Sequence, residues 1–190
     1  MSYPIFEDQI FEKLDFSAKA FPTAEYESCE FNHCNLSGTD LSNCQFTDCI
    51  FTNCNISNAK LGNTAIRDVQ FKDCKLLGLR FDDCNDFLFA ASFTNCNLHL
   101  SSFYQRKMRQ AKFINCDLQE TDFAMAELVQ AIFDNCNLAG AVFDASNLEK
   151  ADFRTSVQFT INPTTNKIKK ARFSKDNLEG LLSHLDIIID

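Results

Sequence analysis

Large apolar residues recur at every fifth position over most of this 190-residue chain. The series begins at Phe11 and runs without a miss to Phe81, and it resumes two residues out of phase at Leu88. An α-helix repeats about every 3.6 residues and a strand every two, so neither explains a strict period of five. The internal repeat therefore decides the architecture before any local propensity does.

A second period, of twenty residues, lies over the first. It is visible in two ladders of identical residues, which are Phe93, Phe113, Phe133 and Phe153, and Cys96, Cys116 and Cys136. If the chain turns a corner every five residues, four corners close a square, and residues twenty apart stack directly above one another. Successive coils then pair as parallel strands, so the expected fold is an all-β quadrilateral β-helix of about eight coils.

Two residues before most of the large residues the chain places a small one, and nine of the ten cysteines, all but Cys84, occupy such positions. This placement favours reduced core thiols, which behave as small hydrophobic side chains, over disulfides or zinc ligands. A zinc site made from Cys29, His33 and Cys34 is disfavoured because His33 occupies an outward position while the cysteines face inward. No metal or cofactor is expected.

The repeat makes residues 1–173 one domain with two irregularities. The spacing from Phe81 to Leu88 is seven instead of five, which predicts a kink at one corner near 85–87, with a functional loop as the alternative. The last coil, over 154–170, departs from the repeat and contains an Asn-Pro-Thr-Thr-Asn turn signal.

Residues 174–190 are predicted to form a short C-terminal α-helix and a tail, with Ser174 as the N-cap. The helix would present one apolar face, made of Leu178, Leu181, Leu182 and Leu185. The tail continues it with Ile187, Ile188 and Ile189. Such a surface at the end of a column is expected to be covered by a second copy of the chain, related by a twofold axis.

The sequence shows no catalytic constellation. Its five glycines are scattered, and no Ser, Cys or His is placed where nucleophile, base and orienting group could meet. The chain is therefore expected not to be an enzyme. The first residues lack a secretory signal and no apolar run is long enough to cross a membrane, so a cytoplasmic location is expected.

Charge is unevenly distributed: residues 1–153 have a net charge of −10, and residues 154–190 a net charge of +2. An acidic body repels nucleic acid and suits a basic protein partner, so no direct nucleic-acid binding is expected. Nearly all charges should point outward, because the inward positions are apolar or small. Two clusters are candidate partner contacts, with ordinary surface charge as the alternative for each. They are the acidic cluster Asp82, Asp83 and Asp86, and the basic patch Arg106, Lys107 and Arg109 with Lys112.

The unit small-x-large-x-x, as in Ala-Val-Phe-Asp-Ala at 141–145 and Ala-Asp-Phe-Arg-Thr at 151–155, resembles the pentapeptide-repeat family. The resemblance covers roughly residues 6–173 and implies a right-handed quadrilateral β-helix. Within the family, the chain length, the stretch 153–163 and the segment 181–185 look most like the microcin B17 immunity protein and the Qnr-type quinolone-resistance proteins.

Those relatives imply a cytosolic homodimer joined at its C-terminal ends. They also imply a DNA mimic that binds DNA gyrase or topoisomerase IV and protects the enzyme from a toxin or a quinolone-type poison. The alternative function is a protein–protein interaction scaffold of unknown partner with no topoisomerase role.

Overall fold

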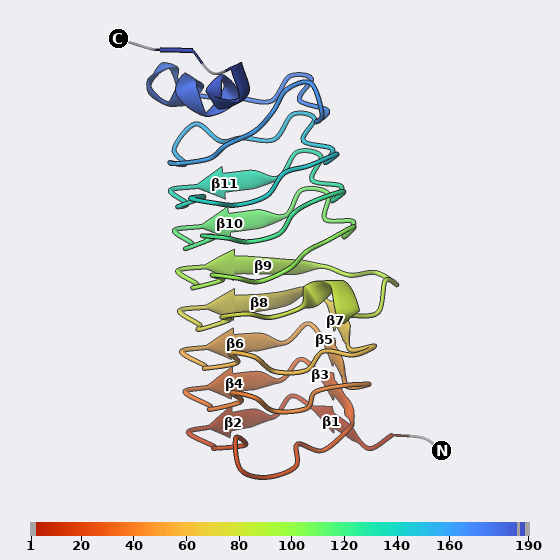
Figure 1. Ribbon diagram of the computed structural model, residues 1–190. Helices are drawn as coiled ribbons and strands as arrows, with labels where there is room; N and C mark the ends of the chain where they lie inside the picture. The colour runs from red at the N-terminus through yellow and green to blue at the C-terminus, as the bar shows by residue number, and fades with distance from the viewer. Residues whose placement is uncertain (1–2, 186, 189–190) are drawn as a thin grey trace.

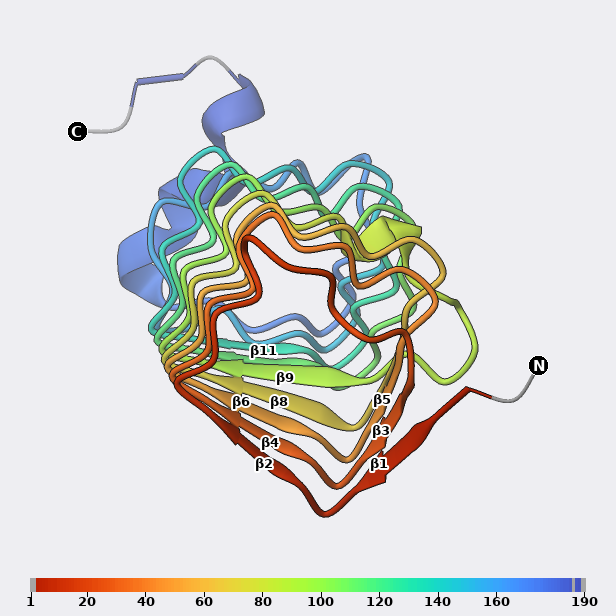
Figure 2. The same cartoon turned by 90° about the horizontal axis from the view of Figure 1, so that it is seen from below.

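A computed structural model describes residues 3–185 and 187–188, which form one square column with the N-terminus at one end and the C-terminus at the other (Figure 1). Viewed along its axis, the coils lie over one another in a four-sided outline and wind in a right-handed sense (Figure 2). The predicted right-handed quadrilateral β-helix is therefore confirmed. Ile189 of the predicted tail lies outside the described residues.

Two parallel sheets form adjacent faces of the column. The short sheet contains β1 (Ile5–Glu7), β3 (Glu25–Glu27), β5 (Gln45–Thr47) and β7 (Ala65–Arg67). The long sheet contains β2 (Ile10–Glu12), β4 (Glu30–Asn32), β6 (Ile50–Thr52), β8 (Val69–Lys72), β9 (Ala91–Thr94), β10 (Lys112–Ile114) and β11 (Ile132–Asp134). Each strand pairs with the strand twenty residues later, except that Val69 of β8 lies opposite Ala91 of β9.

The seven strands of the long sheet mark seven successive coils, slightly fewer than the eight or so predicted. Beyond β11 the same face continues only through the isolated bridges Ile132↔Asp152 and Asp152↔Arg172. The last coil contains a local turn, in which the Thr164 N–H donates to Asn162 Oδ1 at 2.9 Å.

Aromatic rings stack along the column axis. The ring centroid of Phe113 lies 5.1 Å from that of Phe93 and 5.1 Å from that of Phe133, with the planes nearly parallel. Phe153 continues this ladder 4.7 Å beyond Phe133. On the neighbouring inner face a second ladder, which includes Phe123, meets the first edge-on. Each such aromatic contact adds about 0.5–1.5 kcal/mol beyond the burial of its apolar area.

Many side chains at the small inward position donate a hydrogen bond in addition to filling space in the core. The sequence pattern did not indicate this second role. The Cys54 thiol donates to the Phe31 carbonyl at 3.2 Å, and the Ser156 hydroxyl donates to the Phe133 carbonyl at 2.7 Å. In both cases the acceptor belongs to the adjacent coil. All ten cysteines are buried and free of disulfides. Cysteine, serine and threonine are therefore suited to the same position because each is small and can donate one bond.

The residue two positions after most of the large inward residues turns the corner with a positive φ. Examples are Asn53 with φ 54° and Asn95 with φ 55°. Asparagine and aspartate tolerate this left-handed conformation better than other residues that carry a side chain. Some of these corner side chains also bond between coils, as where Asn115 Nδ2 donates to Asn95 Oδ1 at 3.1 Å. The corner geometry explains why Asn and Asp are frequent at this position.

The C-terminal segment contains two 3₁₀ helices, η2 (Lys175–Leu181) and η3 (Ser183–Leu185), in place of the predicted α-helix. They lie across the C-terminal end of the column (Figure 1). Contacts to the column fix this path. The Ile161 N–H donates to the Gly180 carbonyl at 2.9 Å, and Asn177 Nδ2 donates to the Phe153 carbonyl at 3.2 Å. Ser174 does precede the first turn, but its side chain makes no capping bond.

The buried thiols predict a pH-dependent stability. Burial raises the pKa of the Cys49 thiol to about 12, whereas an unfolded thiol ionises near pH 8.5. The folded state then binds the proton more tightly, so stability is full below about pH 8.5 and falls as pH rises towards 12. We expect the urea midpoint to be constant from about pH 7 to 8 and to drop above about pH 9.

The drop should be smaller in Cys49→Ala, because alanine fills the same small position elsewhere in the column and does not ionise. Native protein near pH 8 should also resist Ellman's reagent until urea is added, since a thiol must be exposed and ionised to react. Fast labelling of the native column at that pH would contradict the burial of these thiols.

Candidate protein-interaction surface

The insert predicted near 85–87 forms a loop that projects from one corner of the column (Figure 2). We call residues 85–88 the insert loop. It follows the short 3₁₀ helix η1 (Phe81–Asp83) and precedes β9. Both predicted partner-contact clusters meet here, the acidic one on η1 and the loop and the basic one on the next coil.

Arg106 does not point outward as its charge predicts; it is buried, with 2% of its surface exposed. It occupies the small inward position, two residues before the buried Met108. Its guanidinium donates hydrogen bonds to four acceptors, which are the main-chain oxygens of Asp82 at 2.8 Å, Cys84, and Asn85 at 3.4 Å, and the carboxylate of Asp86 at 2.6 Å. The guanidinium carbon also lies 5.1 Å from the ring centre of Phe89. Arg106 is therefore part of the core and holds the insert loop from inside.

These bonds replace backbone pairing that the insert removes. Elsewhere, neighbouring coils are joined by main-chain hydrogen bonds at regular intervals. Within the described part of the chain, no main-chain bond joins residues 84–90 to residues 104–111. A buried carbonyl without a donor costs about 1–3 kcal/mol. The Arg106 guanidinium supplies the missing donors.

The insert also changes which residue faces the core. The five-residue step predicts Leu88 as the next inward residue, but Leu88 is 64% exposed with a left-handed φ of 58°, and Phe89 takes the inward place at 9% exposure. The Phe87 N–H donates to Asn85 Oδ1 at 2.9 Å, which turns the chain outward before it returns. Phe87 is 66% exposed, and its ring centre lies 5.7 Å from the Arg67 guanidinium.

Beside the insert loop, the corner between the two sheets is recessed. Asp68 and Gln110 turn this corner with a left-handed φ, but Ala90 between them does not, because the chain passes directly into β9. The result is a notch of about 520 Å³. Phe89 and Met108 are among its apolar lining residues.

The charged residues around the loop differ in how they are paired. Arg80 contacts Asp82 at 2.6 Å and Asp83 at 3.4 Å, so one of these two negative charges is compensated locally. Lys107 and Arg109 are exposed and form no ion pair within the described residues. The same part of the chain holds no group of three His, Cys, Asp or Glu side chains placed to bind a metal ion. The basic patch is therefore the more available of the two charged clusters.

A charged ladder runs along the corner between the two sheets, and we call it the charged corner. Its members all have a left-handed φ and are, in order, Asp8, Ser28, Asp48, Asp68, Gln110, Gln130, Lys150 and Lys170. Beside it, Glu7 lies directly opposite Glu27 in the register of β1 and β3. The charged corner is thus acidic in the N-terminal half of the column and basic at the C-terminal end.

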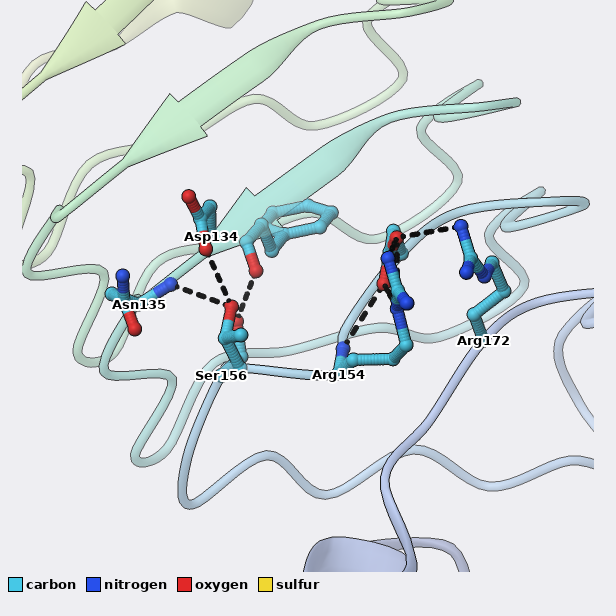
Figure 3. Close-up of polar contacts among 8 residues, drawn as sticks. Asp134, Asn135, Arg154, Ser156 and Arg172 are labelled. Carbon is cyan, nitrogen blue, oxygen red and sulfur yellow. Dashed lines mark hydrogen bonds and ion pairs between the residues drawn. The ribbon is translucent and has the colours of Figure 1, made fainter.

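At the basic end, one carboxylate is shared by two arginines. Asp152 accepts from Arg154 at 2.8 Å and lies 3.2 Å from Arg172 of the next coil. In Figure 3, dashed lines from Arg154 and Arg172 meet at the same side chain. The hydrogen bond from the Arg154 side chain lowers the pKa of Asp152. Lys150 and Lys170 form no ion pair within the described residues.

The residues of the predicted dimer face do not share one side of the C-terminal segment. Leu178, Leu185 and Ile187 are exposed, whereas Leu181 and Leu182 are half-buried, and Leu181 packs against the core.

No helix among the described residues is long and apolar enough to cross a membrane.

The sequence profile described as "Pentapeptide repeat region" matches residues 24–86 and 87–181. Among solved structures, the chain is similar to HetL, a pentapeptide repeat protein from the cyanobacterium Nostoc sp. strain PCC 7120, with a TM-score of 0.62, 14% identity, and 92% of this chain and 88% of that chain covered. It is also similar to full-length QnrB1, a plasmid-mediated fluoroquinolone resistance protein, with a TM-score of 0.49, 17% identity, and 96% and 100% of the two chains covered. No curated protein matches the chain.

The insert and Arg106 should be energetically coupled. Deleting Asp86 and Phe87 restores the five-residue step but leaves a buried guanidinium without its acceptors, and Arg106→Ala alone leaves the loop carbonyls without donors. We expect each single change to destabilise the column. The two changes together should cost less than their sum by about 2 kcal/mol in urea unfolding.

Arg80→Ala is the matched control, because this exposed arginine beside the loop contributes about 0.5 kcal/mol or less. Strict additivity of the two changes would contradict the assignment of Arg106 as the support of the loop.

Proposed function

Because the chain belongs to the pentapeptide-repeat family, we propose that it is a non-enzymatic protein whose acidic side chains imitate duplex DNA on the DNA-binding surface of DNA gyrase or topoisomerase IV. Occupying that surface would protect the enzyme from a toxin or a quinolone-type poison. The observation that carries this proposal is the row of carboxylates on the acidic half of the charged corner, where Glu7, Asp8, Glu27, Asp48 and Asp68 follow one another along the axis.

The geometry suits such a role because the charges are fixed in space. Coils repeat about every 4.8 Å along the column, and duplex DNA carries one phosphate charge per about 1.7 Å of its axis. The acidic corner is less dense than DNA, but its backbone is held by hydrogen bonds in every coil. A rigid row of like charge pays little ordering entropy when it meets a basic surface.

A protein–protein interaction scaffold with no topoisomerase role is the second candidate. The observation that favours it is the change of sign along the charged corner, from Asp8 to Lys170, since a DNA mimic would be acidic throughout. HetL, which shares the fold, is described as involved in heterocyst differentiation regulation. The two functions differ in whether gyrase activity responds to this protein.

A supercoiling assay with purified gyrase and a quinolone separates the two functions. We expect the wild-type protein to restore supercoiling, and a variant with four of the five acids neutralised to need at least about tenfold more protein for the same effect. That variant carries Glu7→Gln, Glu27→Gln, Asp48→Asn and Asp68→Asn. Protection should also weaken as salt is raised, because exposed charges are screened.

The control neutralises the same number of exposed or half-buried acids away from the charged corner. It carries Asp40→Asn, Asp117→Asn, Glu120→Gln and Asp144→Asn. Equal protection by the two variants would reject the acidic corner as the mimic, and no protection by the wild type would favour the scaffold.

We also propose that the chain forms a homodimer through its C-terminal end, since Leu178, Leu185 and Ile187 are exposed there on an otherwise polar surface. Sedimentation should show a wild-type dimer at micromolar concentration, and a monomer for Leu178→Glu with Leu185→Glu. Leu181 is unsuitable for this test, because it packs against the core and its replacement would disturb the fold. Leu100→Glu is the control, because this leucine is 54% exposed but lies at a corner in the middle of the column. A monomeric wild type would overturn the dimer.

A further inference from the structure

We propose that the insert loop and the basic residues around it form a second interaction surface, next to the acidic half of the charged corner, which binds an acidic protein segment that carries a large apolar side chain. We call it the knob-and-base surface. It consists of Phe87, Leu88, Arg67, Lys107, Arg109 and Lys112. Its charge is opposite to that of the acidic corner, so the two surfaces fit different partners.

The apolar part has no packing role in the column. Phe89 fills the inward position at this level, which leaves Phe87 and Leu88 exposed side by side. The loop therefore leaves two adjacent large apolar side chains exposed to solvent, which is the pattern expected of a contact site.

The loop is presented in a fixed shape. Arg106 holds it from inside through the carbonyls of Asp82, Cys84 and Asn85. The Asn85 side chain accepts a bond from the Phe87 N–H at 2.9 Å. An insert loop that is already ordered loses little conformational entropy on binding. Arg106 is thus a positioning residue for this surface, although a partner could not reach it.

The basic part lacks local compensation. Lys107, Arg109 and Lys112 are exposed and have no ion-pair partner within the described residues. The buried Nε of Arg67 has no hydrogen-bond acceptor among them either. The acid of the loop, Asp86, is already engaged by Arg106. The surface therefore carries positive charge that an acidic partner can complement.

The notch beside the loop provides a place for the apolar side chain of the partner. Phe89, Met108 and Ala111 contribute apolar lining, while Arg109 and Lys112 lie at the same notch. Its volume of about 520 Å³ is in the range of small-ligand pockets and can hold one large side chain. A protein segment is favoured over nucleic acid as the partner, because the notch has apolar lining that one large side chain can fill.

The test is a selection from a phage-displayed library of random dodecapeptides on the immobilised wild-type protein. The library is counter-selected on a variant with Phe87→Ser, Leu88→Asn, Arg109→Gln and Lys112→Gln. Asparagine suits the left-handed φ at position 88, as at other corners of this chain, so this variant should remain folded. We expect the enriched peptides to combine Asp or Glu with Phe, Leu or Trp.

The enriched peptides are then synthesised and their affinities are measured by fluorescence anisotropy. Phe87→Ser with Leu88→Asn, and Arg109→Gln with Lys112→Gln, should each weaken binding at least about tenfold. Arg106→Met should also weaken peptide binding because it removes the support of the insert loop, although the buried Arg106 side chain does not contact the peptide. Leu100→Asn is the control for the loop, because Leu100 is also exposed and left-handed, and Lys60→Gln with Lys75→Gln is the control for charge. Both controls should stay within about twofold.

Three results would overturn the proposal. The first is a selection that enriches no peptide able to distinguish the wild type from the counter-selection variant. The second is a set of enriched peptides without an acidic excess. The third is a loss of affinity in the controls equal to that in the loop variants. Gyrase protection is measured with different variants, so failure here leaves the function proposed above intact.

Discussion

The column depends on the stacking of each residue over the residue twenty positions later. The backbone bond, the aromatic contact and the bond from the small inward side chain all point along the same axis, as at Phe133, whose ring stacks on Phe153 and whose carbonyl accepts from Ser156. A change in the length of one coil therefore disturbs all three contacts together. The chain accommodates its extra residues by turning Leu88 outward and by placing a charged donor inside the column.

The same constraint leaves the outer surface free to differ from coil to coil. The inward positions are committed to packing, so the outward residues can vary without loss of the fold. The acidic half of the charged corner and the knob-and-base surface lie on one rigid body and adjoin at Asp68. A protein of this kind can present surfaces of opposite charge to different partners, which a small globular domain with a single binding cleft does more rarely.

The five-residue period predicted most of the fold, because it states directly which residues lie one above another. The same period places Arg106 two residues before Met108, at an inward position; the prediction that it points outward was wrong because it followed from charge alone. The choice of Phe89 over Leu88 could not be predicted, since it depends on Arg106 and on the turn at Asn85. The 3₁₀ form of the C-terminal segment depends on the hydrogen bond that the Gly180 carbonyl accepts from the column, and no local sequence pattern predicts this bond.

The pairing of a buried arginine with an inserted loop also constrains how such a chain could have evolved. A guanidinium at an inward position of an uninterrupted column would lack the loop carbonyls and the carboxylate that Arg106 uses. A longer coil without the arginine would leave buried loop carbonyls without a donor, at a cost of about 1–3 kcal/mol each. Each change alone therefore lowers the stability of the column, so we expect the loop and the arginine to be inherited together.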